Sequence, residues 1–244
     1  MTGLGRVAVV IPTWNEAEAI GTVVAEVLAQ GVGEVIVADG GSTDGTQARA
    51  VAAGARVMDC GRGYGRACAM GAEAASPSCD VIAFMDGDGA DRADQLARIC
   101  GPVLAGEREF VIASRTRGAR EKGSMLWLQV VAGAVLGGLI GLLYRVRYTD
   151  LCALRAIDRL SLARLEMHDM TYGWNIEMQM KAARSGLRLL ELPVPYRVRA
   201  GGTSKVAGSF RGTLHAAVKI LATFVRIACS AAPANGTGEQ GRRE

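Results

Sequence analysis

The feature that most constrains the fold of this chain is a series of short, apolar, mostly β-branched runs in its first half. They read RVAVVI (6–11), EVIVA (34–38), DVIAFM (80–85) and FVIAS (110–114), with a weaker run at 55–58. Between them lie segments with apolar residues at helical spacing, as in residues 16–30. Strands that alternate with helices in this way predict an α/β protein with a mainly parallel sheet.

Acidic or turn-forming residues follow three of these runs directly. Pro12–Glu16 follows RVAVVI, Asp39 ends the EVIVA run, and FMDGDGAD (84–91) brings three aspartates at the end of DVIAFM. On its own, FMDGDGAD favours an acidic surface turn, because Asp and Gly are ordinary turn residues. Ligands of parallel sheets bind beyond the carboxyl ends of strands, however, and divalent cations take oxygen ligands. Three such strand ends at one edge therefore favour a metal-and-phosphate site.

Composition excludes several classes of protein. The net charge of +4 over 244 residues is too small to indicate nucleic-acid binding. The six cysteines form no CxxC pair, and the two histidines give no metal-site spacing with them. We therefore expect a reduced, cytoplasmic chain. The opening MTGLGRVAVVIPTW lacks the layout of a signal peptide, because its apolar run is short and enters a Pro-Thr turn.

Residues 125–143, MLWLQVVAGAVLGGLIGLL, just reach the length of a membrane-spanning helix. A span would place the segments before and after it on opposite sides of a membrane. We therefore expect a helix that either packs on the fold or lies at a membrane surface.

The last third of the chain predicts two helices and an edge strand. Residues 171–186 form a helix with Gly186 as its C-cap, and the two prolines of ELPVPYRV (191–198) favour an edge strand or an extended segment. Residues 209–228 form an amphipathic helix, either packed on the core or lying in a membrane interface. Its apolar row is Phe210, Leu214, Val218, Leu221 and Val225, and its basic side is Arg211, His215, Lys219 and Arg226.

Six segments, in this order, resemble glycosyltransferase family 2. They are IPTWNE (11–16), EVIVADGGSTDGT (34–46), FMDGDG (84–89), ASR (113–115), TDLCALRA (149–156) and ELPVPYRVRAGGTSK (191–205). The closer resemblance, carried by the last three, is to the dolichyl- or polyprenyl-phosphate sugar (mannose or glucose) synthases. It covers about residues 6–226.

The resemblance implies a GT-A fold, with a Rossmann-like, mainly parallel central sheet flanked by helices. Residues 1–230 would form one domain: 6–116 would bind the nucleotide sugar, 117–208 the acceptor, and 209–230 would be an interfacial basic helix. The tail 231–244 would be disordered.

The same resemblance implies a role for individual residues. The nucleotide pocket would be lined by Pro12, Trp14, Glu16, Val37 and Gly87, and Asp39 would hydrogen-bond the base or ribose. Asp86 and Asp88 would hold Mg²⁺ or Mn²⁺ on the donor diphosphate. The catalytic set would be Asp88 and three cations that face the phosphates, namely Arg115, Arg155 and Lys205. Arg199 and Lys205 would bind the acceptor phosphate.

The chain departs from the family pattern at three places. Gly40 stands where a second Asp usually follows Asp39, Ala90 stands where a Gln often follows the DxD motif, and CALR retains only Arg155 of the usual GSFR-like element. These departures leave the base and sugar of the donor open. The glycine-rich GRGYGR (61–66) follows no strong strand, so we interpret it as a loop near the sugar rather than a dinucleotide fingerprint.

The expected activity is metal-dependent transfer of a sugar, with inversion, from a nucleotide-diphosphate sugar to a polyprenyl-type phosphate. The enzyme would bind the cytoplasmic face of a membrane peripherally. A phosphate acceptor is already ionised and needs cations rather than a strong base. If the acceptor is instead a soluble or saccharide hydroxyl, Glu177 is a candidate base, although a solvated residue would explain it equally. A non-catalytic, membrane-associated nucleotide-binding protein is the alternative from another class.

Overall fold

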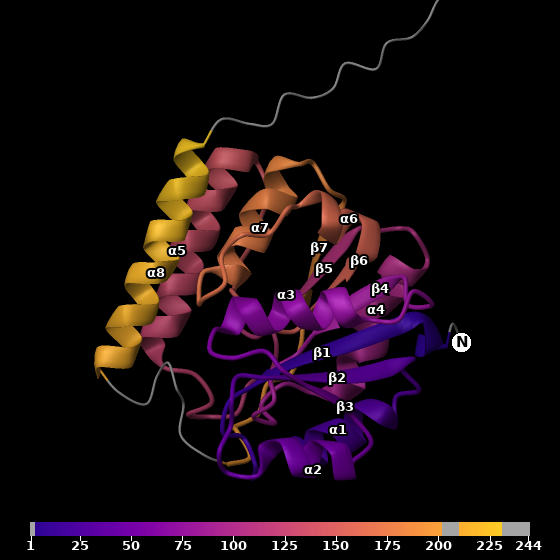
Figure 1. Ribbon diagram of the computed structural model, residues 1–244. Helices are drawn as coiled ribbons and strands as arrows, with labels where there is room; N and C mark the ends of the chain where they lie inside the picture. The colour runs from indigo at the N-terminus through magenta and orange to yellow at the C-terminus, as the bar shows by residue number, and fades with distance from the viewer. Residues whose placement is uncertain (1–2, 202–209, 231–244) are drawn as a thin grey trace, which may run out of the picture.

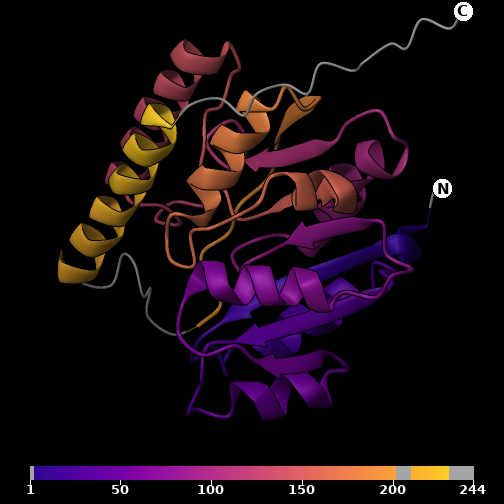
Figure 2. The ribbon, with the colours of Figure 1, turned by 45° about the horizontal axis from the view of Figure 1, so that its top comes forward.

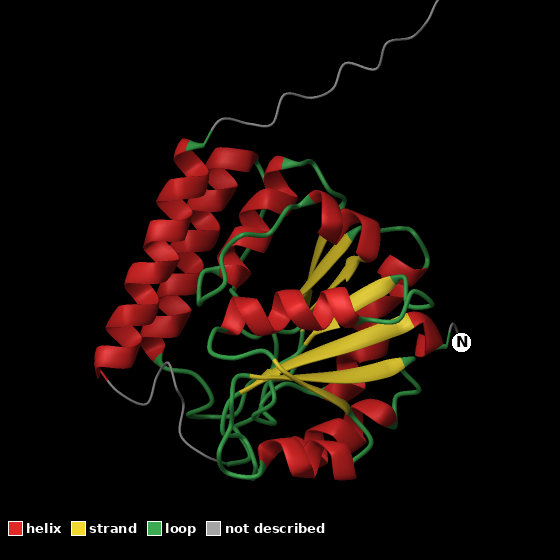
Figure 3. Ribbon diagram, in the orientation of Figure 1, coloured by secondary structure: helices red, strands yellow, loops and turns green. Residues whose placement is uncertain are grey.

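A seven-stranded sheet in the order β3-β2-β1-β4-β6-β5-β7 forms the centre of the computed structural model, which describes residues 3–201 and 210–230 (Figures 1 and 3). Neighbouring strands are parallel except where β6 pairs with β4 and β5. The strands are β1 (Val7–Thr13), β2 (Glu34–Asp39), β3 (Arg56–Asp59), β4 (Val81–Phe84), β5 (Phe110–Ser114), β6 (Arg155–Asp158) and β7 (Leu189–Pro193). The mainly parallel α/β sheet predicted from the sequence is confirmed.

The apolar runs of the sequence are the buried strands of this sheet. All seven residues of β1 are buried, as expected for a strand with neighbours on both edges and helices on both faces. Its register places Ile11 beside Val37 of β2 and Val10 beside Phe84 of β4. This register sets the ends of β1, β2 and β4 next to one another.

Helices cover both faces of the sheet. On one face α3 contacts β1 and β2, and α7 contacts α3 (Figure 1). Trp174 of α7 packs edge-on against Phe84 of β4. On the other face α1 packs with α2, and α4 packs on β4, β5 and β6. The helices are α1 (Ile20–Leu28), α2 (Thr46–Ala52), α3 (Tyr64–Ala74), α4 (Leu96–Leu104), α5 (Trp127–Tyr144), α6 (Arg159–Arg164), α7 (Trp174–Arg184) and α8 (Phe210–Cys229), with 3-10 turns η1 (Leu4–Arg6) and η2 (Ala93–Gln95).

Two long helices, α5 and α8, run alongside each other on the outside of the molecule, where both contact α7 (Figures 1 and 2). Helix α5 packs inward through one narrow face, formed by Gly133, Leu136, Gly137 and Ile140. A Cβ atom at Gly137 would overlap the carbonyl oxygen of Tyr148, so glycine permits this close approach of helix and backbone.

Helix α5 is the one helix in the described part of the chain that is long and apolar enough to cross a membrane. The chain enters it from β5 and leaves it towards β6, and these two strands are direct neighbours in the sheet. The segments before and after α5 therefore both lead into the same sheet. The expectation of a helix that packs on the fold is confirmed for its inner face.

The sequence placed some elements imperfectly. The predicted edge strand 191–198 is β7, which ends earlier at Pro193 and lies at the sheet edge. The predicted helix 171–186 is α7, and Gly186 follows it with a φ of 67°, as a C-terminal glycine should. The strand β6 and the helices α4 and α6 were not predicted. The predicted disordered tail, 231–244, lies outside the described residues.

Candidate active site

The ends of β1, β2 and β4 bring the predicted site segments together at the carboxyl edge of the sheet. Thr13 at the end of β1 donates a hydrogen bond of 3.1 Å to Asp39 at the end of β2. On the other side of β1, Asp86 lies two residues beyond the end of β4 and accepts a hydrogen bond of 3.3 Å from Tyr64 at the start of α3. The single edge expected from the sequence therefore exists.

Two loops at this edge are joined to each other by hydrogen bonds. The backbone N–H groups of Asn15, Glu16 and Ala17 donate to the side chains of Ser42, Thr46 and Asp44, at 2.7, 2.9 and 3.1 Å. The Asn15 side chain in turn accepts a bond of 2.9 Å from the backbone of Thr43. The GGSTDGT segment therefore fixes the conformation of the loop that carries Trp14 and Glu16.

Asp39 is fully buried under its own loop. Its carboxylate accepts hydrogen bonds from Thr13, from the side chains of Ser42 and Gln47, and from the backbone of Gly41 and Ser42. Burial alone would raise the pKa of Asp39, but these hydrogen bonds lower it below its ordinary value. In this structure Asp39 orders the loop, and its contact with a base or ribose stays a prediction.

Trp14 and its neighbours are the residues predicted to line a nucleotide pocket. The ring of Trp14 is half-buried, and the guanidinium of Arg62 lies 3.6 Å from its centroid, in cation–π contact. Arg62 belongs to the GRGYGR loop, so that loop lies beside Trp14. By contrast, Pro12 and Val37 are buried inside β1 and β2, where they cannot line an open pocket.

The FMDGDGAD segment forms a tight turn that sets three carboxylates close together. Asp91 is buried and accepts a hydrogen bond of 3.2 Å from the backbone of Asp86, and Asp88 accepts one of 2.9 Å from the backbone of Ala90. A Cβ atom at Gly87 would lie 2.7 Å from the Thr13 side chain, so only glycine fits beneath β1. This packing fixes the turn against the sheet.

The crowding of these carboxylates changes their protonation. Burial, together with the charges of Asp91 and Asp88, raises the pKa of Asp86 to about 8. Burial and the charge of Asp88 raise the pKa of Asp91 to about 6. Carboxylates that hold protons near neutral pH are short of positive charge, and a bound cation would supply it.

The residues present fit a divalent cation that binds together with a diphosphate. In the described ranges, 3–201 and 210–230, no three Asp, Glu, His or Cys side chains are grouped so as to hold a metal by themselves. Mg²⁺ is usually held by one or two carboxylates plus substrate phosphates, which suits Asp88 and Asp86. Both carboxylates belong to the turn at the donor edge, as the sequence predicted.

The predicted arginines are placed differently from one another. Arg115 donates to both carboxylate oxygens of buried Asp150, at 2.8 and 2.7 Å, and lies 5.1 Å from the ring of Tyr196. Arg155 is fully buried, and its guanidinium donates to the backbone carbonyls of Cys152, Ala153 and Asn175. The prediction that Arg155 faces a phosphate does not describe this structure, because the first residue of β6 points between the sheet and α7.

Arg199 is the predicted acceptor residue that the structure brings into the site. Its guanidinium lies 3.0 Å from both carboxylate oxygens of Glu16 and 3.8 Å from Asp88. Lys205 lies outside the described residues. Glu177, the candidate base, is fully buried, with its carboxylate 3.0 Å from Lys181 and bonded to the backbone of His168 and Asp169. It is therefore neither a solvated residue nor open to a substrate.

Sequence reasoning missed Tyr64 as a neighbour of the aspartates. Its hydroxyl lies between Asp86 and the side-chain amide of Asn175, which is 3.5 Å away. Burial and the Asp86 charge raise the pKa of Tyr64 well above its ordinary value, so it remains a hydrogen-bond donor. The signal was present in GRGYGR, where the glycine before Tyr64 has a φ of 135° and ends the loop at the start of α3.

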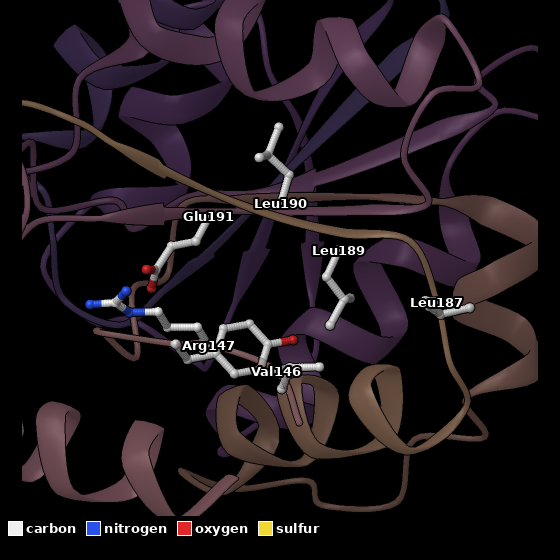
Figure 4. Close-up of a pocket in the computed structure, with 7 residues that line it drawn as sticks. Val146, Arg147, Leu187, Leu189, Leu190 and Glu191 are labelled. Atoms are coloured by element: carbon white, nitrogen blue, oxygen red, sulfur yellow. The ribbon is translucent and has the colours of Figure 1, made fainter. Parts of the chain in front are cut away.

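Two cavities lie away from this edge. One, of about 270 Å³, lies between β7 and the segment that follows α5 (Figure 4). The other, of about 370 Å³, lies where α6, α7 and α8 meet. Neither is lined by any residue predicted for the donor site. The open edge that carries the aspartates, rather than an enclosed cavity, is the candidate active site.

The comparisons with known proteins agree with this geometry. The model of glycosyl transferase family 2 matches residues 8–154, and the chain belongs to this family. An uncharacterized glycosyltransferase of Mycobacterium tuberculosis is 33% identical over 212 residues, which cover 85% of this chain and 93% of that protein. The dolichyl-phosphate hexose transferase of Haloferax volcanii is 30% identical over 200 residues, covering 80% and 85%.

Among solved structures, glucosyl-3-phosphoglycerate synthase from Mycobacterium tuberculosis, in complex with Mn²⁺, UDP-glucose and phosphoglyceric acid, aligns with a TM-score of 0.72. It is 25% identical and covers 91% of this chain and 79% of that one. The GT-A fold implied by the sequence resemblance is confirmed, and the protein is a glycosyltransferase.

Proposed function

We propose that this glycosyltransferase moves a sugar from a nucleotide-diphosphate sugar to a polyprenyl-type phosphate at the cytoplasmic face of a membrane. The reaction inverts the anomeric centre, because the acceptor phosphate attacks in line with the departing diphosphate. The observation that carries the acceptor assignment is an exposed apolar surface on α5 and α8.

That surface, called here the apolar helix face, consists of large side chains left in solvent. Trp127 and Leu142 are 76% and 80% exposed, and the row Val218, Leu221 and Val225 on α8 is more than half exposed. Its other members are Leu128, Val131, Val135, Leu139 and Leu143. A large apolar patch exposed to solvent indicates contact with a partner or a membrane.

A membrane suits this surface better than a protein partner does, because α8 has a buried inner face and an outer face that exposes both apolar and basic side chains. Ala216, Thr223 and Ile227 are buried, while Val218, Leu221 and Val225 and the basic residues Lys219 and Arg226 are exposed. A helix with exposed apolar and basic side chains fits the interface of an anionic membrane. Of the two alternatives left open by the sequence, the inner face of α8 fits core packing and its outer face fits membrane contact.

The course of the chain between the sheet and the apolar helix face supports a lipid-linked acceptor. β5 and β7 run in the same direction as β4. The segments that leave them towards α5 and α8 therefore depart from the edge that carries the aspartates. A polyprenyl phosphate held at the membrane by its chain would present its phosphate to this edge.

Each part of the site has a task in the proposed reaction. Trp14 borders the base, and Asp88 and Asp86 would hold a divalent cation that neutralises charge developing on the leaving diphosphate. Arg199 offers a guanidinium fork to phosphate oxygens. The named activity of the Haloferax relative supports a lipid phosphate acceptor, and the Mn²⁺ and UDP-glucose complex of the solved structure supports the donor and the metal.

The test is a transfer assay with purified protein and Mn²⁺ or Mg²⁺. Nucleotide sugars are offered with polyprenyl phosphate in vesicles, with 3-phosphoglycerate, or with no acceptor. We expect product only with the lipid phosphate. Equal or greater product with phosphoglycerate would instead support a soluble acceptor, as the name of the solved synthase would suggest. Nucleotide binding without any turnover would support the non-catalytic alternative.

A further inference from the structure

A short segment of the chain lies directly across the aspartate turn. In this segment, residues 196–201, called here the strap, the backbone N–H of Arg197 donates to Ala90 at 3.2 Å and that of Ala200 donates to Asp88 at 2.9 Å. The Arg197 side chain donates to the carbonyl of Gly89 at 2.5 Å and to Glu26 at 2.6 Å. The strap is therefore held to the turn by its own backbone and by Arg197, independently of Arg199.

The guanidinium of Arg199 reaches from the strap into the candidate metal site. One of its nitrogens lies 3.0 Å from each oxygen of Glu16 and 3.8 Å from Asp88, and a second donates to the carbonyl of Gly201 at 2.9 Å. The three charged side chains are largely buried, at 21%, 10% and 18% exposed for Arg199, Glu16 and Asp88. A positive charge thus already stands beside the carboxylate that would hold the metal.

We propose that Arg199 is a built-in competitor of the divalent cation. Without a donor, its guanidinium neutralises Glu16 and Asp88 and opposes metal binding. When a nucleotide diphosphate enters, its phosphates give Arg199 a better partner, and Asp88 becomes available to the metal. Metal and donor therefore bind cooperatively. This inference rests on the metal-binding part of the proposed function but not on the identity of the acceptor.

The argument follows from charge and geometry. A guanidinium and a divalent cation on one carboxylate repel each other, and partial burial weakens the screening by solvent. The planar fork of arginine binds phosphate oxygens in pairs, so a diphosphate can replace the carboxylates as its partner. Arg199 would thus weaken binding of the metal alone and strengthen binding of the metal together with the donor. Such coupling between two ligands typically changes the affinity for each by a factor of about 5 to 150.

The experiment is calorimetric titration of Mn²⁺ into the metal-free full chain, alone and with saturating UDP or GDP, whichever binds. For Arg199→Gln we expect Mn²⁺ alone to bind about tenfold tighter than to wild type. With the nucleotide present the order should reverse, so that the variant binds Mn²⁺ several-fold more weakly. The matched control is Arg92→Gln, which removes the same charge from an exposed arginine that pairs with Asp94 just after the turn, and which should leave Mn²⁺ binding alone within about twofold of wild type.

Equal Mn²⁺ affinity of wild type and Arg199→Gln, or an equal rise in both glutamine variants, would overturn the proposal, because the effect would then be absent or would reflect net charge alone. Arg199→Lys, which keeps the charge but not the fork, should resemble wild type for Mn²⁺ alone and lose the cooperativity. If Arg199→Gln fails to fold by circular dichroism, this variant carries the test. Sugar transfer to lipid with equal Mn²⁺ affinities would refute only the competitor role. No Mn²⁺ binding to any chain, with or without nucleotide, would refute the metal site as well.

Discussion

Arg115 and Asp150 form a bidentate ion pair that joins the chain before α5 to the chain after it. The side chain of Arg115, just after β5, donates to both carboxylate oxygens of Asp150, and its backbone N–H adds a bond of 2.9 Å. Burial would raise the pKa of Asp150, but the charge and hydrogen bonds of Arg115 lower it below its ordinary value. The pair therefore joins the segment that leaves β5 towards α5 to the segment that returns from α5 towards β6.

The first prediction concerns the stability supplied by this pair. Asp150→Asn leaves a largely buried guanidinium without a counter-charge, and we expect it to lower the free energy of unfolding by about 3 kcal/mol. Arg117→Ala is the control, because Arg117 is 50% exposed and its ion pair with Glu191, at 3.5 Å, is screened by solvent. This variant should change the free energy of unfolding by less than about 1 kcal/mol. Urea denaturation measures both, and equal losses would contradict a special role for Asp150.

The second prediction tests the close packing of α5. Gly137→Ala places a methyl group against the carbonyl of Tyr148 and should destabilise the protein by about 1–3 kcal/mol. Its neighbour Gly138 has open space where a Cβ would stand, so Gly138→Ala should stabilise the helix by about 0.5–1 kcal/mol. Thermal melts of the two variants should therefore shift in opposite directions. Similar shifts would mean that α5 does not pack as described.

The third prediction concerns pH and the aspartate turn. Because the folded, metal-free protein raises the pKa of Asp86 to about 8, it binds this proton more tightly than the unfolded chain does. The stabilisation from protonated Asp86 is therefore lost as pH rises through about 8. Asp86→Asn has no proton to lose at this position, so its stability does not change for this reason. Between pH 6 and pH 9 the melting temperature of the metal-free wild type should therefore fall relative to that of the variant, by about 2–4 °C or more.

Added Mn²⁺ provides the control for that experiment. It should raise the melting temperature of wild type most at high pH, where Asp86 is ionised, and should do little for Asp86→Asn. Parallel pH profiles of the two metal-free proteins would contradict the account of crowded carboxylates.

The fourth prediction tests the apolar helix face. Leu142→Glu and Leu221→Glu each place a charge on it, and each should weaken binding to anionic vesicles about tenfold. Both side chains are exposed, at 80% and 53%, so the melting temperature should hardly change. Leu160→Glu, at a 71% exposed position on α6, is the matched control. Co-sedimentation that is unchanged in all three variants would argue against this surface as the membrane contact.

The strands and the donor edge were predictable because their signals are local. A buried apolar run that reaches an Asp or Asn within two residues of its end marks both a strand and the edge where it ends, and β1, β2 and β4 all carry this signal. The strand β6 carries no such signal. It is four residues long, begins with Arg155 and ends with Asp158, and it exists because β4 and β5 pair with it on both sides.

The partners of the charged residues were not predictable for a related reason. Arg155 could be recognised as part of a motif, but no local pattern signals that its guanidinium turns inward to the carbonyls of Cys152 and Ala153 and to that of Asn175 in α7. Arg199 lies far along the chain from Glu16 and Asp88, and no local pattern links them. Asp39 was recognised as a site residue, whereas its many contacts within its own loop depend on the path of residues 40–47.

The most direct test of the central claim is the amount of glycosylated lipid formed by wild type and by Asp88→Ala, from the donor that binds and polyprenyl phosphate in vesicles. Asp94→Ala is the control, because exposed Asp94 pairs with Arg92 outside the turn. The account predicts a lipid product of inverted configuration with wild type and Asp94→Ala, lost on chelation and restored by Mn²⁺ or Mg²⁺. It predicts a loss of at least about 100-fold with Asp88→Ala. Full activity of Asp88→Ala, or sugar transfer that does not depend on the lipid phosphate, would contradict it.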